Sequence, residues 1–151
     1  MPTLSERIAT DFKAAMLARD SFKTELLSGL KAAILNEEVA RGVRDTGLDE
    51  TAIEQVISRE VKKRDEAARL FSEGDRPESA DKERREAEIL KTYLPEQLDE
   101  AAIRAIVDDV IAELQPQGIK DMGRVIGAVK AKVGNTADGA IVASLVKSSL
   151  Q

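Results

Sequence analysis

The sequence predicts an all-α protein in which a four-helix subdomain is followed by a three-helix subdomain. The composition is rich in Ala, Glu, Lys, Leu and Arg and poor in aromatic residues and Pro, which is typical of helical chains. Apolar residues recur at intervals of three and four, and the alternation that marks a strand is nowhere sustained. Pro95, in YLPEQL, interrupts the fourth helical pattern. We therefore expect residues 1–96 to form the first subdomain and residues 97–151 the second.

The first two helices are delimited by capping residues. Thr3 and Glu6 have the spacing of a capping box, which predicts a helix over residues 4–18. Asp20 is placed to cap a second helix, whose apolar residues continue to about residue 39. The motif RGVRDTG then breaks the pattern and predicts a loop.

Two later helices open with nearly the same sequence, LDETAI at residues 48–53 and LDEAAI at residues 98–103. In each, Asp caps the first turn, and the Leu before it packs on the Ile four residues after it. The first of these helices ends near the motif EGDRP, and a fourth runs from about Pro77 to Tyr93. After Pro95 we expect helices over residues 99–114, 121–133 and 138–150.

Two charged residues fall on apolar stripes in the first subdomain. Arg64 lies on the stripe of the third helix and Glu83 on that of the fourth. Because a lone charge in an apolar seam is costly, we predict that these two side chains meet across the bundle. The alternative is that both are partly exposed at the edge of the bundle.

Missing residue types exclude several kinds of chemistry. The chain has no Cys and no His, which excludes disulfides, thiolate and imidazole catalysis and the usual zinc ligands. Neighbouring carboxylates such as Glu37 and Glu38 splay apart on a helix instead of converging on a substrate. We therefore expect no catalytic residue, no metal site and no cofactor in this chain.

Location and general partners are predicted from the first residues and from the net charge. The opening MPTLSERIAT has no apolar stretch behind basic residues, and no run of about 18 apolar residues occurs. We expect a cytoplasmic protein with no membrane partner. The net charge of −5 argues against a general nucleic-acid coat, so no DNA partner is expected.

The charges are distributed unevenly along the second subdomain. From residue 99 to residue 118, acidic residues outnumber basic ones by five to one. From residue 119 to residue 151, only Asp121 and Asp138 oppose the basic residues Lys120, Arg124, Lys130, Lys132 and Lys147. The end of the chain is therefore locally positive.

Gly123 and Gly127 lie on the helix predicted over residues 121–133, opposite an apolar face that includes Val125 and Val129. Each Gly inside a helix costs about 1 kcal/mol relative to Ala, so two on an outward face require an explanation. A flat surface edged by cations admits a phosphate backbone at close range. The alternative is that another helix packs closely there.

The motif EILKTYLPEQL, followed by MGRVIGAVKAKVGNTADGAIVASLVKSSL, resembles the YqeY family over essentially the entire chain. The C-terminal part is also similar to the tail domain of GatB, one component of the glutamine-dependent aspartyl/glutamyl-tRNA amidotransferase. The resemblance implies the four-helix and three-helix architecture and a role related to tRNA, because that tail contacts tRNA and performs no catalysis. Where the family commonly has Gly, Gly and a basic residue before Ala-Asp-Gly, this chain has Gly134, Asn135 and Thr136.

The resemblance and the charge pattern together predict a tRNA-binding accessory module. Its implied partners are tRNA and a tRNA amidotransferase or aminoacyl-tRNA synthetase. One alternative is a protein adaptor that binds no RNA. Another is a carbon-nitrogen ligase activity, with glutamine as amido donor, exerted only with partner subunits. The predicted RNA-binding residues are Lys120, Gly123, Arg124, Gly127, Lys130, Lys132 and Lys147.

Overall fold

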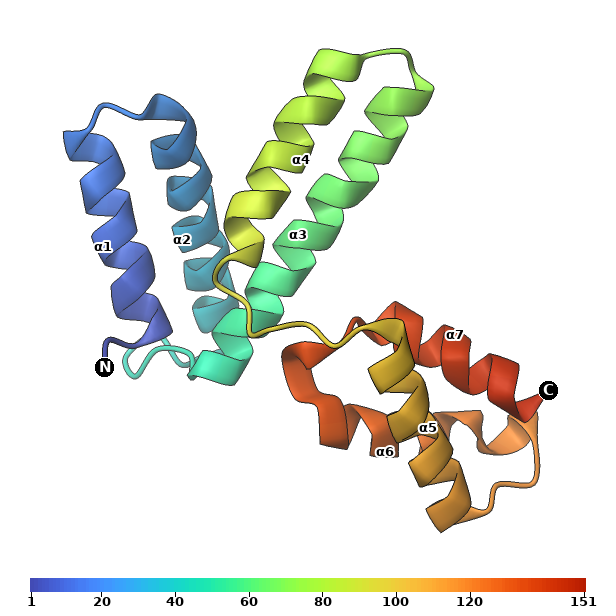
Figure 1. The fold of residues 1–151 in the computed structure, drawn as a ribbon. Helices are drawn as coiled ribbons and strands as arrows, with labels where there is room; N and C mark the ends of the chain where they lie inside the picture. Colours follow the sequence, from blue (N-terminus) through green and yellow to red (C-terminus); the bar gives the residue numbers. More distant parts are fainter. The chain divides into compact units, whose positions relative to one another are not determined.

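The computed structural model describes the whole chain, Met1–Gln151, as seven α-helices and two 3-10 turns with no strand (Figure 1). This confirms the all-α prediction. The chain divides into two compact units, Met1–Leu94 and Pro95–Gln151, where the sequence suggested a boundary after residue 96. None of the helices is both long and apolar enough to span a membrane.

The first unit consists of two helical hairpins. Helices α1 (Leu4–Leu17) and α2 (Ser21–Arg41) form one, and α3 (Glu50–Glu73) and α4 (Pro77–Lys91) form the other. Figure 1 shows the two hairpins close together at the start of α3 and diverging toward their turns. A shared apolar core joins them, and its buried members are Leu4, Ile8, Leu26, Leu27, Leu30, Ile53, Val56, Ile57, Val61, Ala87, Leu90 and Tyr93.

The helix ends follow from capping chemistry. Thr3 and Glu6 form the capping box at the start of α1, as the sequence predicted. Asp20 and Asp49 each accept a backbone N–H of the first turn of the helix that follows. Gly42 ends α2 with φ at +68°, a left-handed conformation that Gly adopts with little strain.

Polar contacts also link the two hairpins. The Glu50 carboxylate accepts the backbone N–H of Leu4 at 2.9 Å, so α3 supplies a cap for α1. The Tyr93 hydroxyl donates to the carboxylate of Asp11. Burial, and then the hydrogen bond to Asp11 and the charge of that carboxylate, raise the pKa of the Tyr93 phenol, so Tyr93 is held in its neutral, donating form.

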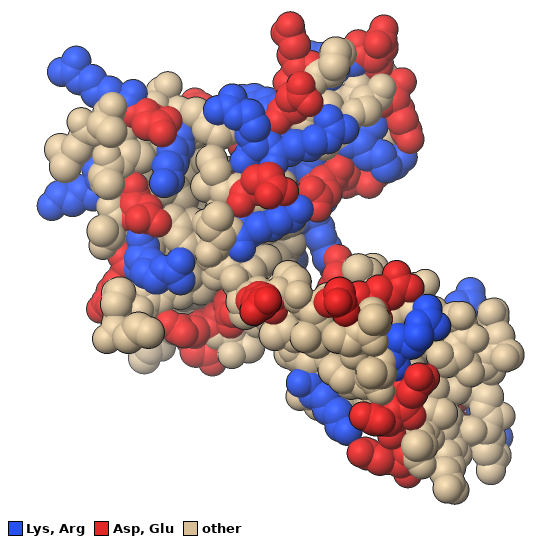
Figure 2. All heavy atoms as spheres, viewed as in Figure 1, with Lys and Arg blue, Asp and Glu red and all other residues tan.

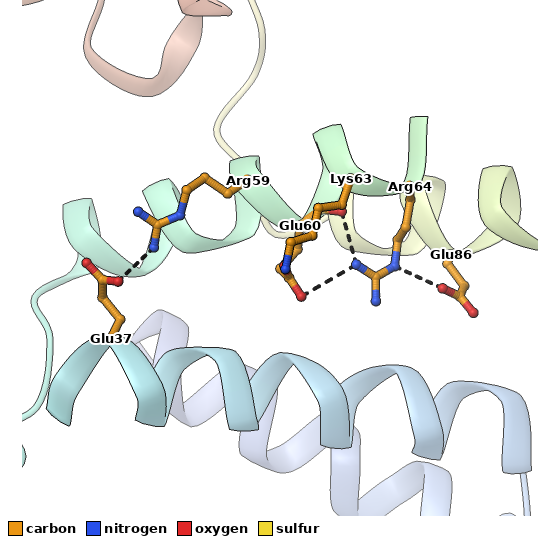
Figure 3. Close-up of polar contacts among 6 residues, drawn as sticks. All are labelled: Glu37, Arg59, Glu60, Lys63, Arg64 and Glu86. Atoms are coloured by element: carbon orange, nitrogen blue, oxygen red, sulfur yellow. Dashed lines mark hydrogen bonds and ion pairs between the residues drawn. The ribbon is translucent and has the colours of Figure 1, made fainter. Parts of the chain in front are cut away.

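The prediction that Arg64 meets Glu83 is wrong. Figure 3 shows Arg64 pointing instead toward Glu86 of α4 and Glu60 of its own helix. Its Nε donates to Glu86 Oε2 at 2.9 Å, and its Nη1 donates to the Glu60 carbonyl at 3.0 Å. The hairpin turn explains why Arg64 meets Glu86 and not Glu83. Arg64 is as many residues from the end of α3 as Glu86 is from the start of α4. Residues equally far from a hairpin turn lie level with each other.

The second unit is a three-helix unit made of α5 (Glu100–Leu114), α6 (Met122–Val133) and α7 (Gly139–Leu150). Asp99 and Asp138 cap α5 and α7 by accepting a backbone N–H in each first turn. Short 3-10 turns at Ile119–Asp121 and Gly134–Thr136 precede and follow α6. The three helices enclose a core of their own, formed by Ile103, Val107, Val110, Val125, Val129, Val133, Val142, Leu145 and Val146.

Candidate nucleic-acid interface

The two glycines of α6 lie on its outer, solvent-exposed face. Val125 and Val129 are fully buried on the inner face, whereas Gly123 and Gly127 are exposed. A Cβ atom added at either glycine would meet no atom within 4 Å. No helix of the second unit therefore occupies this face, and the backbone of α6 is accessible along it.

Three exposed cations share this face with the glycines. Helical spacing places Arg124 and Lys130 within about a quarter-turn of the line through Gly123 and Gly127, and Lys120 lies in the 3-10 turn that leads into α6. The Arg124 side chain is 52% exposed, and its Nη2 lies 3.7 Å from Asp121 Oδ2. Its hydrogen bond to the Leu114 carbonyl is long, at 3.5 Å. Both contacts leave the guanidinium available to a ligand.

Lys130 lies against the beginning of α7. Its Nζ is 3.5 Å from the position that a Cβ of Gly139 would take. Because α6 and α7 run antiparallel in Figure 1, Lys147 lies about level with Met122, each eight residues from this contact. Lys147 is exposed at this level of α7.

Lys132 does not join this group. Its Nζ pairs with Glu113 Oε1 of α5 at 3.1 Å. The side chain thus lies on the edge of α6 that faces α5, away from Gly123. Lys132 is thus a predicted binding residue that the structure separates from the glycine face.

The neighbouring helix α5 has the opposite charge. Asp108, Asp109 and Glu113 are all exposed. Figure 2 shows acidic side chains gathered over α5, with few basic ones among them. The second unit thus carries opposite charge on α5 and α6, and charge alone favours an anion over α6.

Two residues near this face were missed by the sequence analysis as parts of the surface. Asp121 accepts the backbone N–H of Gln117 at 2.8 Å and partly neutralises Arg124, a relation that the three-residue spacing could have revealed. Ile119, half-exposed beside Lys120, adds an apolar contact. The sequence contains no signal for Ile119, because an apolar residue in a turn is as often buried as exposed and the sequence does not show which.

The face defined by Lys120, Gly123, Arg124, Gly127 and Lys130, which we call the α6 face, offers amines, a guanidinium and accessible backbone. Such groups bind anions through charge and hydrogen bonds. No group of three or more acidic side chains in the chain is placed to hold a metal ion.

These features define a small all-helical protein with an exposed cationic helix face. A family model described as "Yqey-like protein" matches residues 5–150, and the chain belongs to this YqeY family. The resemblance found in the sequence is thereby confirmed.

Curated relatives carry the name "Altered inheritance of mitochondria protein 41, mitochondrial". The protein from Lachancea thermotolerans is 32% identical over 107 residues, covering 70% of this chain and 56% of that protein. The protein from Clavispora lusitaniae is 26% identical over 132 residues, covering 87% of this chain and 75% of that protein. The chain thus spans little more than half the length of the Lachancea relative.

The names of these relatives overturn one expectation. Both of the relatives above are named as mitochondrial proteins, and the prediction of a cytoplasmic location is wrong by this comparison. The prediction rested on the opening residues and on the lack of a long apolar run, and neither observation identifies the compartment.

Proposed function

We propose that this protein is a non-catalytic accessory module that binds tRNA through the α6 face. The supporting observation is the uncovered backbone at Gly123 and Gly127, where an added Cβ would meet nothing within 4 Å. Flanking cations at Lys120, Arg124 and Lys130 supply charge complementary to phosphate. The chain belongs to the YqeY family, and the resemblance of its C-terminal sequence to the amidotransferase tail directs the proposal to tRNA.

The proposed recognition is of shape and phosphate. All four aromatic residues, Phe12, Phe22, Phe71 and Tyr93, belong to the first unit, so the second unit has no ring on which a base can stack. Single-stranded RNA is usually read by such stacking. The α6 face therefore suits the double-helical parts of a folded RNA, with an affinity that falls steeply as salt rises.

The proposed partner of the bound complex is an enzyme of tRNA-dependent amidation or aminoacylation. The module would hold the body of the tRNA while that enzyme acts on its end. A ligase activity with glutamine as amido donor would then belong to the partner subunits. An adaptor that binds protein alone through the same face is the competing outcome of the test.

The test replaces the three cations of the α6 face together, as K120Q/R124Q/K130Q. Binding to total tRNA is measured by gel shift at two salt concentrations. We expect the variant to lose at least about tenfold in affinity at low salt, and the slope of log K against log salt to fall by about 2 to 3. The residues are exposed, so the fold should be retained in circular dichroism.

A matched control removes the same charge from the first unit, as K13Q/R44Q/K82Q, also at exposed positions. This control should bind tRNA nearly as the parent protein does. Unchanged tRNA retention by the α6 variant would overturn the proposal, as would equal losses in both variants, which would indicate non-specific attraction. If the α6 variant lost a protein partner and no RNA affinity, the adaptor would take its place.

A further inference from the structure

An apolar ridge runs along the outer side of α2, away from the core of the first unit. Leu27 and Leu30 are buried on the inner side, whereas Leu35 is 41% exposed and Val39 is 60% exposed. Leu35 and Val39 lie in one line along α2 with two smaller residues that precede them, because the successive spacings are four, three and four residues. The ridge, as we call this line, consists of Ser28, Ala32, Leu35 and Val39, all of them exposed.

The order of side-chain sizes in the ridge is self-complementary. Two small residues come first and two large residues follow. If a second α2 lies antiparallel against the first, Leu35 faces Ala32 of the other copy and Val39 faces Ser28. Each large side chain then fills the space above a small one, as close packing requires. A parallel pair would instead set large against large and small against small.

The charges beside the ridge have the same symmetry. Lys31 and Glu38 are seven residues apart, so they lie on the same flank of α2. In a twofold antiparallel pair, the same flank of each helix lies on the same side of the contact. Lys31 of each copy therefore comes near Glu38 of the other. The Lys31 ammonium lies 4.6 Å from the centre of the Phe12 ring, so α1 borders this flank of α2.

We propose that the ridge is a self-association surface on which two copies of this chain pair reversibly through antiparallel α2 helices. Complementarity of both size and charge under one twofold axis argues for a second copy as the occupant, because a different protein would not be expected to match the ridge's own sequence. About four side chains from each copy form the contact, far fewer than the 20 to 30 residues a side of a stable interface. The dimer is therefore weak and depends on concentration and salt. The proposal is independent of RNA binding.

The test is sedimentation velocity of the full chain from about 10 μM to about 1 mM at low salt, a range that covers weak affinities. We expect the weight-average sedimentation coefficient to rise with concentration. L35E should weaken association at least about tenfold, because it places a carboxylate in the contact. The control L17E alters an exposed Leu outside the ridge and should associate as the parent does.

Charge exchange tests the flank contacts. K31E sets a new carboxylate against Glu38 of the other copy and should weaken the dimer, and the double variant K31E/E38K should restore it. A parent protein that stays monomeric to about 1 mM would overturn the proposal. So would equal effects of L35E and L17E, or a double variant no better than K31E.

Orientation has a separate test, because the chain has no cysteine. In an oxidised mixture of S28C and V39C proteins, the antiparallel dimer predicts mainly cross-links between the two different variants. Cross-linking mainly between copies of the same variant would contradict the antiparallel pairing.

Discussion

At the scale of single residues, Gly123 and Gly127 lower the stability of α6 without any packing benefit inside the second unit. Gly127 lies in the interior of α6 and Gly123 lies in its first turn, and each has open space where a Cβ would be. Changing Gly127 to Ala should raise the free energy of unfolding by about 1 kcal/mol, because Ala loses less conformational freedom on folding, and G123A should gain less because Gly123 lies in the first turn. The double variant G123A/G127A should gain the sum of the two single gains in urea unfolding followed by circular dichroism.

Gly42 provides the control for this substitution. Its φ of +68° is left-handed, so G42A should lower stability by about 1 kcal/mol even though the added Cβ meets no atom within 4 Å. If G123A/G127A also lost stability, some part of the protein would pack against the α6 face in solution. A gain would mean that the flat surface is retained at the expense of helix stability.

At the scale of secondary-structure elements, the α3–α4 hairpin depends on an ion pair that spans it. Arg64 is only 16% exposed, and Glu86 is its partner on α4. E86A removes that partner and leaves Arg64 with Glu60 of its own helix. We expect a loss of about 1 to 2 kcal/mol in the free energy of unfolding, because a largely buried charge loses half of its pairing.

E83A is the matched control for this change. It removes a carboxylate from the same helix, one turn away and not in contact with Arg64. Urea unfolding should show less than about 0.5 kcal/mol of change. Equal losses in E83A and E86A would mean that the loss reflects the charge of α4 and not the ion pair.

Sequence information was most reliable where local chemistry decides the structure. Capping by Thr3, Asp20 and Asp49 identified the starts of three helices, since each side chain satisfies N–H groups a few residues away. The partner of Arg64 could also have been predicted, from the equal distances of Arg64 and Glu86 to the α3–α4 turn. The apolar stripe did not give it. An apolar stripe identifies the buried side of a helix. It does not show how far that helix is shifted along its axis relative to its neighbour.

Surfaces were harder to predict than helices for a related reason. Helical periodicity showed that Gly123 and Lys130 share a side of α6, but not whether another helix covers that side. It also grouped Lys132 with the predicted binding residues, although Lys132 pairs with Glu113 of α5. Which helix lies on which edge is a tertiary property, and a single sequence does not fix it.

At the scale of the whole molecule, the two units have separate apolar cores. Every buried core residue of the first unit lies at or before Tyr93, and every one of the second lies at or after Ile103. Burial of apolar surface is the main source of stability, so neither unit requires side chains of the other to form its core. The charge polarity between α5 and α6 is likewise a property of the second unit alone.

The second unit should therefore fold when produced alone as residues 95–151. Domains of this size are marginally stable but do fold without staples, so we expect helical circular dichroism and a cooperative, reversible urea transition. The unfolding midpoint should be close to that of the same helices in the full chain, followed there through a fluorescent label on α7. V129A in the fragment serves as control and should cost about 1 to 3 kcal/mol, because Val129 is fully buried. A fragment without cooperative unfolding would show that the second core depends on the first unit after all.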